Sequence, residues 1–483
     1  MLDLLTNLWP HLLGAIGLIL ATVLSAHVVL HKRNERAAVA WVGLLWLSPL
    51  LGPVLYLLLG INRIRRRAVQ LRPERQYRQA SGESGHSGHA NLVDALPKDR
   101  RNLQNLAMLI GKVTHTPLTA GNSVTLLING DAAYPEMIRA IDAAGRTVVL
   151  STYIFNRDAA GHRFADALER ALRRSVEVRV LIDGLGSWYS LPPIVGLLRK
   201  RGIPVARFLY SFVPWRMPYL NLRNHPKILL TDGQIGFTGG MNIAEGNLVS
   251  ESPPSPITDT HFRLEGPVVG HLMETFAEDW LFTTGERLEG TAWFPSLEPA
   301  GAVFARGIGA GPDEEFDKLR WTLLGAVSEA RAAIKILTPY FLPDEVLVAA
   351  LRVAAMRGVA VDIVLPERSN LAFVAWAAAP RLDEILTAGC RIWLSAPSFD
   401  HSKLMLVDGA WAMFGSTNWD SRSLRLNFEF NVECYDRDFA DRLNRLIDGK
   451  IAKSRAVTLA ELTGRSLPVK LRDGIARLFS PYL

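Results

Sequence analysis

The sequence has few cysteines and no evident set of metal ligands. Only Cys390 and Cys434 occur among 483 residues, which excludes a disulfide scaffold and any zinc or iron–sulfur site built from several cysteines. No cluster of carboxylates is present that would hold catalytic magnesium or zinc. The glycines of residues 295–314 do not open a helix after a strand, and no Gly-Lys-Ser or Gly-Lys-Thr follows them, so they do not form a nucleotide-binding loop. We therefore expect neither a cofactor nor a metal.

The sequence also has little net positive charge outside one short segment. The chain has 54 Lys and Arg residues against 47 Asp and Glu, a net charge of +7. Residues 62–75 hold six arginines and one glutamate, so this arginine run alone carries +5 of that charge. A nuclease needs phosphate contacts distributed over its surface, so the nearly neutral remainder predicts no nucleic acid partner. The hydrophobic content of 49% nevertheless provides for a large folded core.

Two long uncharged stretches precede the arginine run. Residues 11–30 and 37–61 are each long enough to cross the ~30 Å core of a bilayer as a helix. The link between them is short, which predicts a transmembrane helical hairpin, and Pro49 and Pro53 predict a kink or a re-entrant turn in its second helix. The first ten residues contain no Lys or Arg, which disfavours a cleaved signal peptide. A buried hairpin of a soluble protein is the alternative.

The distribution of Lys and Arg around these stretches predicts the orientation. The link has three such residues and the segment after the second stretch has six. The larger number predicts a multi-pass protein with everything after the second span in the cytoplasm. The arginine run would then lie against anionic headgroups. Residues 76–92 resemble a flexible tether, and a solvated linker is a simpler interpretation of His86 and His89 than a metal site.

The remainder of the chain contains an internal repeat. Residues 140–155 resemble residues 326–341, and each copy has the pattern of a helix end followed by a strand. A further helix and strand follow each copy, and such alternation is typical of α/β domains. The stretch rich in Gly and Pro at 295–314 is the expected join. We therefore predict a hairpin over 1–61, a basic and flexible linker over 62–92, and α/β lobes over 93–295 and 296–483.

One pattern of polar residues occurs once in each lobe with the same spacing. The pattern is H-x-K-x4-D-x6-G-(G or S)-x-N. A lone H-x-K would carry little information, but a match at five positions in both copies of a repeat is specific. The first copy supplies His225, Lys227, Asp232 and Asn242, and the second supplies His401, Lys403, Asp408 and Asn418.

These residue types indicate phosphodiester chemistry. We expect a strand over residues 225–231, so that His225 and Lys227 project from the same face. Convergence of the two copies would bring together two imidazoles that titrate near neutrality, two positive charges and two amides. Lysine and asparagine would stabilise phosphoryl oxygens, while one histidine attacks phosphorus and the other protonates the departing alcohol. The alternative, that the histidines are ordinary core residues, is disfavoured because both copies are intact.

The doubled pattern resembles the phospholipase D superfamily. With the two apolar stretches added, the sequence resembles the bacterial cardiolipin synthases, and residues 49–60, 338–344 and 479–483 are similar to further signatures of that family. The resemblance covers essentially the whole chain. It implies an α/β fold of two phospholipase D-like lobes with pseudo-twofold symmetry and one active site at their interface.

The resemblance also implies roles for the residues of the two motifs. His225 is the nucleophile that becomes a phosphatidyl-histidine, and His401 is the general acid and then the general base. The catalytic set is completed by Lys227, Lys403, Asp232 and Asp408. Of these, the lysines hold the phosphoryl oxygens together with Asn242 and Asn418, and the aspartates have a supporting role.

Family members orient each histidine with an acid from the opposite lobe. The best matches are Glu429 for His225 and Asp259 for His401, although both could be structural acids. The first motif has Gly240 where the second has Ser416, which leaves open how the halves divide the work.

The implied reaction joins two phosphatidylglycerol molecules into cardiolipin and glycerol, and the implied partners are phosphatidylglycerol, other anionic phospholipids and the membrane. Alternatives with the same site chemistry are a phospholipase D-type hydrolase, a nuclease, and a synthase that uses phosphatidylethanolamine as donor. A scaffold without activity is a further alternative. Trp215, Met217, Tyr219 and Leu220 would contact acyl chains or pack in the core. The sequence predicts no particular oligomeric state.

Overall fold

The computed structural model describes residues 2–32, 35–60, 92, 96, 98–210, 222–311 and 317–480. The chain divides into two units, Met1–Arg67 and Ala68–Leu483. Most of the predicted linker over 62–92, including the arginine run, His86 and His89, lies outside the described residues, as do Trp215, Met217, Tyr219 and Leu220.

The N-terminal unit contains one helix that could cross a membrane, among the residues that the structure describes. Residues Leu13–His31 have a mean hydropathy of 2.2. The predicted second span over 37–61 is not continuous, because the helix stops just before Pro49, whose ring nitrogen has no hydrogen to donate. The predicted interruption is therefore present, but within residues 35–60, the part of this span that the structure describes, no second full-length span is found. The elements are α1 (Leu2–His31), α2 (Glu35–Leu47), α3 (Leu51–Leu55) and the π-helical turn η1 (Tyr56–Gly60).

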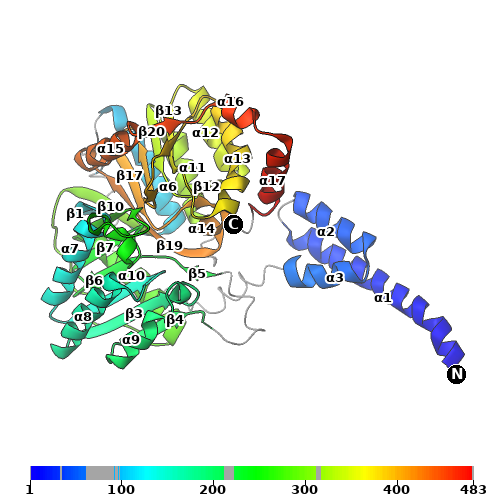
Figure 1. The fold of residues 1–483 in the computed structure, drawn as a ribbon, viewed down its shortest axis with the longest axis horizontal. Helices are drawn as coiled ribbons and strands as arrows, with labels where there is room; N and C mark the ends of the chain where they lie inside the picture. The colour runs from blue at the N-terminus through cyan, green and yellow to red at the C-terminus, as the bar shows by residue number, and fades with distance from the viewer. Residues whose placement is uncertain are drawn as a thin grey trace. The chain divides into compact units, whose positions relative to one another are not determined.

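The first half of the larger unit contains the first repeat (Figure 1). Its helices are α6 (Leu103–Thr114), α7 (Asn129–Ala143), α8 (Ala159–Arg173), α9 (Ile194–Lys200) and α10 (Val268–Thr284), with short 3-10 turns at Lys98–Arg100, Gly186–Trp188, Glu245–Asn247 and Val249–Glu251. Its strands are β1 (Thr119–Ile128), β2 (Thr147–Thr152), β3 (Glu177–Asp183), β4 (Val205–Phe208), β5 (Arg223–Asn224), β6 (Ile228–Thr231), β7 (Ile235–Gly239), β8 (Ile257–Thr258) and β9 (Thr260–Glu265).

The second half contains the second repeat. Its helices are α11 (Lys318–Glu329), α12 (Glu345–Met356), α13 (Ala372–Thr387), α14 (Ser421–Arg425), α15 (Arg437–Ile451), α16 (Leu459–Thr463) and α17 (Leu467–Leu478). Its strands are β10 (Val303–Ala310), β11 (Ala333–Leu337), β12 (Phe341–Leu342), β13 (Ala360–Pro366), β14 (Arg391–Ser395), β15 (Phe399–Asp400), β16 (Leu404–Val407), β17 (Trp411–Gly415), β18 (Trp419–Asp420), β19 (Asn427–Tyr435) and β20 (Ser454–Ala456).

The strand order repeats itself outward from the pair formed by β1 and β10, which are antiparallel. The first half runs β1-β9-β7-β6-β2-β3-β4, and the second runs β10-β19-β17-β16-β11-β13-β14. In each half the strand that opens the repeat, β2 or β11, has one parallel and one antiparallel neighbour. The sequence repeat therefore corresponds to a repeated arrangement of strands.

The same side-chain cap begins a helix in each half. Asp158 accepts a hydrogen bond from the Gly161 N–H at 2.9 Å at the start of α8. Asp344 accepts from the N–H groups of Val346 and Leu347, each at 3.0 Å, at the start of α12. Such caps satisfy amides that have no partner within the helix. They fix the start of the helix that follows the opening strand of each repeat.

Apolar packing joins the two halves. The rings of Phe262 on β9 and Phe414 on β17 stack with their centroids 3.7 Å apart, within a core that both halves share. Helix α6, which precedes the first repeat in the sequence, packs instead in the core of the second half, where Leu106 is fully buried. Since both cores combine segments from both halves, their relative position is fixed by buried apolar surface.

The predicted strand over 225–231 is too long. The structure has β5 (Arg223–Asn224) and β6 (Ile228–Thr231), with His225 and Lys227 in the irregular segment between them. The equivalent segment lies between β15 and β16. Each histidine and lysine pair is therefore positioned by a connection between two strands rather than by the alternation of one strand.

Candidate active site

Each motif histidine follows a short strand that pairs with the opposite half. Strand β5 is parallel to the start of β19, and the His225 N–H donates to the Phe428 carbonyl at 3.0 Å. Strand β15 is parallel to β8, and the His401 N–H donates to the Thr258 carbonyl at 2.8 Å. These two strand pairings bring each histidine beside an acid of the other half.

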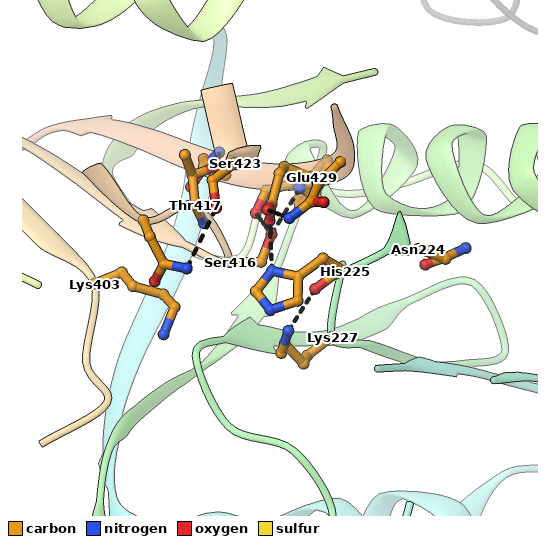
Figure 2. Close-up of polar contacts among 12 residues, drawn as sticks. Asn224, His225, Lys227, Lys403, Ser416, Thr417, Ser423 and Glu429 are labelled. Carbon is orange, nitrogen blue, oxygen red and sulfur yellow. Dashed lines mark hydrogen bonds and ion pairs between the residues drawn. The ribbon is translucent and has the colours of Figure 1, made fainter. Parts of the chain in front are cut away.

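The two acids that the sequence suggested lie beside the expected histidines. Nδ1 of His225 is 2.9 Å from Oε2 of Glu429, and Nδ1 of His401 is 2.9 Å from Oδ2 of Asp259. Figure 2 shows the His225 ring between Glu429 and Lys227. Because each carboxylate occupies Nδ1, the Nε2 atom of each ring is the nitrogen left for a ligand.

The acids have different surroundings. The Ser416 hydroxyl donates to Oε2 of Glu429, and the Asn427 amide donates to Oε1 at 3.0 Å. At the position equivalent to Ser416, a Cβ added to Gly240 would lie 2.3 Å from Oδ1 of Asp259 and 2.9 Å from the His401 carbonyl. Glycine is therefore required in the first motif for space, whereas serine in the second supports the longer acid.

The motif lysines are buried beside the histidines. Nζ of Lys227 donates to the His225 carbonyl at 2.6 Å, and Nζ of Lys403 donates to the His401 carbonyl at 2.6 Å. Each lysine therefore anchors the backbone of the histidine two residues earlier. The ammonium of Lys227 also lies 5.7 Å from the centre of the Tyr153 ring.

Burial governs the protonation of this cluster. It lowers the pKa of both His225 and His401 well below the ordinary value, and the two lysine charges lower it further. Burial also lowers the pKa of Lys227 to about 7 and that of Lys403 to about 8. The cluster without substrate therefore favours neutral imidazoles beside lysines that titrate close to neutrality.

The paired acids are shifted in the opposite direction. Burial raises the pKa of Glu429 to about 7, although Lys227 and the Ser416 hydrogen bond oppose the shift. Burial raises the pKa of Asp259 to about 7, and Lys403 opposes that shift most strongly. An anionic ligand near the lysines would favour their charged forms, and the charged lysines would in turn favour the carboxylate forms of the two acids.

A cavity of about 340 Å³ opens onto both histidines. That volume lies in the range of sites for small molecules. Asn242 and Asn418 line it, and Oδ1 of Asn242 is held by the Ile154 N–H at 3.1 Å. Its wall also includes residues that the sequence argument did not select, namely Tyr153, Tyr189, Arg223, Tyr340, Asn370, Asp420 and Arg422.

The motif aspartates lie elsewhere. Asp232 accepts hydrogen bonds from three consecutive backbone amides, those of Gly145, Arg146 and Thr147, where β2 begins. Asp408 accepts from the amides of residues 331–333, where β11 begins. Neither lines the cavity. Both hold the turn after the motif strand against the opening strand of its repeat.

Two tyrosines outside the motif contact the motif histidines. Tyr153 contacts the His225 ring edge to face with the centroids 5.2 Å apart, and Tyr340 lies 6.4 Å from the His401 ring in the same way. Both belong to the repeated segments 140–155 and 326–341, so comparison of the repeats contained a signal for them. Among the described residues, no group of three or more His, Cys, Asp or Glu side chains is placed to hold a metal ion.

Comparison with known proteins agrees with this geometry. Residues 137–280 and 323–450 match the family model described as cardiolipin synthase, PLD-like domain, and residues 19–60 match the phospholipase D-nuclease N-terminal model. Cardiolipin synthase A of Pseudomonas putida is 33% identical over 98% of this chain and 98% of its own. The chain belongs to the cardiolipin synthase family.

Two further likenesses extend this result. Cardiolipin synthase 1 of Bacillus cereus is 30% identical over 97% of this chain and 94% of its own. The crystal structure of phosphatidylserine synthase from Haemophilus influenzae Rd KW20 has a similar fold, with a TM-score of 0.62, 15% identity, and coverage of 78% of this chain and 100% of that chain. As a member of the cardiolipin synthase family, the chain is a phosphatidyltransferase that acts on anionic phospholipids at a membrane.

Proposed function

We propose that this cardiolipin synthase works through a phosphatidyl-histidine on His225, with phosphatidylglycerol as both donor and acceptor. One observation carries the proposal. His225 and His401 line one cavity of about 340 Å³, and each has its Nδ1 bound to a carboxylate from the other half. Two Nε2 atoms are thereby available to a single phosphodiester.

In the first step, Nε2 of neutral His225 attacks the phosphorus of the donor. The bond from phosphorus to the glycerol oxygen breaks, and His401 gives its Nε2 proton to that oxygen, so glycerol leaves. The negative phosphate raises the pKa of His401 toward the imidazolium form that this step requires. Glu429 accepts the Nδ1 hydrogen of His225 and stabilises the positive charge that develops on the ring.

In the second step, neutral His401 takes the proton of a glycerol hydroxyl on the acceptor phosphatidylglycerol. The deprotonated oxygen attacks phosphorus, the bond to Nε2 of His225 breaks, and cardiolipin forms. One phosphodiester replaces another, so the reaction needs no nucleotide. The proposal includes no metal, no cofactor and no nucleic acid partner.

The remaining motif residues have distinct proposed roles. Lys227 and Lys403 supply the positive charge that stabilises phosphoryl oxygens in both steps. Asn242 and Asn418 line the cavity and donate to the same oxygens. Asp232 and Asp408 are positioning residues that fix the motif strands through backbone amides. Asp259 and Glu429 orient the two imidazoles.

The proposed architecture has two lobes related by a pseudo-twofold axis, over 93–295 and 296–483. The repeated strand order supports it. We also propose that the hairpin over 1–61 anchors the chain as a multi-pass protein of a bacterial inner membrane, with the lobes in the cytoplasm. Because Cys390 and Cys434 are buried, a cysteine introduced at exposed Glu298 would report the side on which the lobes lie. An impermeant maleimide should label it in inverted vesicles and not in right-side-out vesicles.

Defined lipids test the reaction. Purified enzyme in vesicles of labelled phosphatidylglycerol should release glycerol and form cardiolipin in equal amounts. Phosphatidic acid as the main product would instead identify a hydrolase. Release of ethanolamine in place of glycerol when phosphatidylethanolamine is added would identify that lipid as the donor. His225→Ala and His401→Ala should each abolish turnover, with His86→Ala as the control.

A further inference from the structure

The product of the proposed reaction contains two phosphodiesters. The histidine site accounts for one of them, since a single phosphorus is attacked twice. The acceptor brings its own phosphate, separated from the attacking hydroxyl by one glycerol. During the second step a second negative charge must therefore lie close to the first, and the cavity needs a second group of cations to bind it.

Two arginines outside the motif pattern line the cavity. Arg223 lies in β5, two residues before His225, and Arg422 lies in α14, four residues after Asn418. Both side chains are half-buried, so their charges are only partly screened by water. A guanidinium presents paired N–H donors in a fixed plane, which matches two oxygens of one phosphate.

Two carboxylates in this region, those of Asp183 and Asp420, accept hydrogen bonds from backbone amides. Oδ1 of Asp183 accepts from the Leu185 and Gly186 amides, and its Oδ2 accepts from the Asn224 amide, all at 2.9 Å. Asp420 caps α14 by accepting from the Ser423 amide at 2.7 Å. Both acids therefore use carboxylate oxygens to hold backbone amides.

The arginine charges are close enough to oppose each other. Burial lowers the pKa of Arg422, and the positive charge of Arg223 lowers it further. Arg223 donates through Nη1 to the Leu222 carbonyl at 2.9 Å, and no carboxylate in the described part of the chain forms an ion pair with it. Two guanidinium groups that repel each other across a cavity gain most from an anion bound between them.

We propose that Arg223 and Arg422 form a second phosphate subsite, which binds the phosphodiester of the acceptor phosphatidylglycerol. This inference rests on the proposed function, since it assigns the acceptor of the same reaction. The subsite orients the acceptor glycerol so that its free hydroxyl faces the phosphatidyl-histidine. It also selects an alcohol that carries a phosphate over water and over free glycerol.

The test compares two reactions of one intermediate. Labelled glycerol attacks the phosphatidyl-histidine and returns labelled phosphatidylglycerol, and this acceptor has no phosphate. Cardiolipin formation uses an acceptor that has one. The ratio of the two rates is independent of how much of a preparation is folded, so it isolates the acceptor subsite.

Arg223→Gln and Arg422→Gln, made in the full chain, should each lower the ratio of cardiolipin formation to glycerol exchange by about tenfold to a hundredfold. That range is the loss expected for a charge-assisted hydrogen bond. Arg223→Lys should recover part of the ratio, because it keeps the charge without the planar pair of donors. Arg199→Gln, at an exposed position on α9, is the matched control and should keep the ratio of the unaltered enzyme.

Two outcomes would overturn the subsite. An unchanged ratio in both glutamine variants would show that the acceptor phosphate binds elsewhere. An equal fall in both rates would assign the arginines to the donor phosphate. Failure of the proposed function looks different, since the unaltered enzyme would then exchange no labelled glycerol at all.

Discussion

Oε2 of Glu429, in the second half of the chain, lies 2.9 Å from Nδ1 of His225 in the first half. The strand pairing of β5 with β19 produces this contact, because it places residues 223–224 beside residues 427–428. Asp259 and His401 repeat the relationship in the opposite direction. Each imidazole therefore depends on both halves of the fold for its position and its proton.

Glu429→Gln is expected to lower kcat by about 10²–10⁴-fold, as when the acid that orients a catalytic histidine is removed. The loss should persist with a donor whose leaving group is p-nitrophenolate, because attack by His225 is itself impaired. Asp259→Asn should instead recover a first-turnover burst of nitrophenolate, since this leaving group needs no proton from His401. Rapid-quench measurement of the nitrophenolate burst distinguishes the two variants. A burst in Glu429→Gln and none in Asp259→Asn would reverse the assignment of nucleophile and acid.

Replacing each of Gly240 and Ser416 by the residue of the other motif should lower activity to different extents. Ser416→Gly leaves space intact and removes one hydrogen bond to Glu429, so we expect a fall in kcat of about tenfold. Gly240→Ser forces a Cβ against the Asp259 carboxylate and the His401 carbonyl, so we expect near-complete loss of activity. Steady-state rates with phosphatidylglycerol measure both. Similar activities for the two variants would contradict the steric argument.

The alkaline side of the pH profile should reflect the buried lysines. With a pKa of about 7 for Lys227 and about 8 for Lys403, each ammonium is charged below its pKa and loses its charge as the pH rises. We therefore expect kcat/KM to fall above about pH 7–8. In kcat the fall should occur at higher pH, because bound phosphate stabilises the charged lysines. Profiles of both constants that stay flat to pH 10 would exclude this role.

Asp408→Ala should act on stability rather than chemistry. It leaves three partly buried backbone amides without their acceptor, for which we expect a loss of about 1–3 kcal/mol in the free energy of unfolding. Glu298→Ala, at an exposed position, is the control. Denaturant unfolding measures the effect, and kcat per folded molecule should stay within about threefold of the unaltered enzyme. A large loss of kcat at unchanged stability would assign Asp408 to the reaction itself.

Particular residues show how far the sequence leads. The identical offsets from His225 to Asn242 and from His401 to Asn418 predicted one site shared by both copies, and these four residues line one cavity. The alternation of strands and helices predicted the α/β class correctly. The strand expected over 225–231 was too long, because pairing of β5 with the other half ends the strand before Lys227.

The sequence by itself determined the duplicated motif, its candidate catalytic residues and the apolar N-terminal segment, since these depend on local spacing and composition. Only the tertiary structure decided that Gly240 cannot be serine. It alone also brought Arg223 and Arg422 into the same cavity. The physical reason is that the site joins the two halves of the chain, as His225 and Glu429 do across 204 positions. Pairing of short strands between the halves and a shared apolar core bring them together.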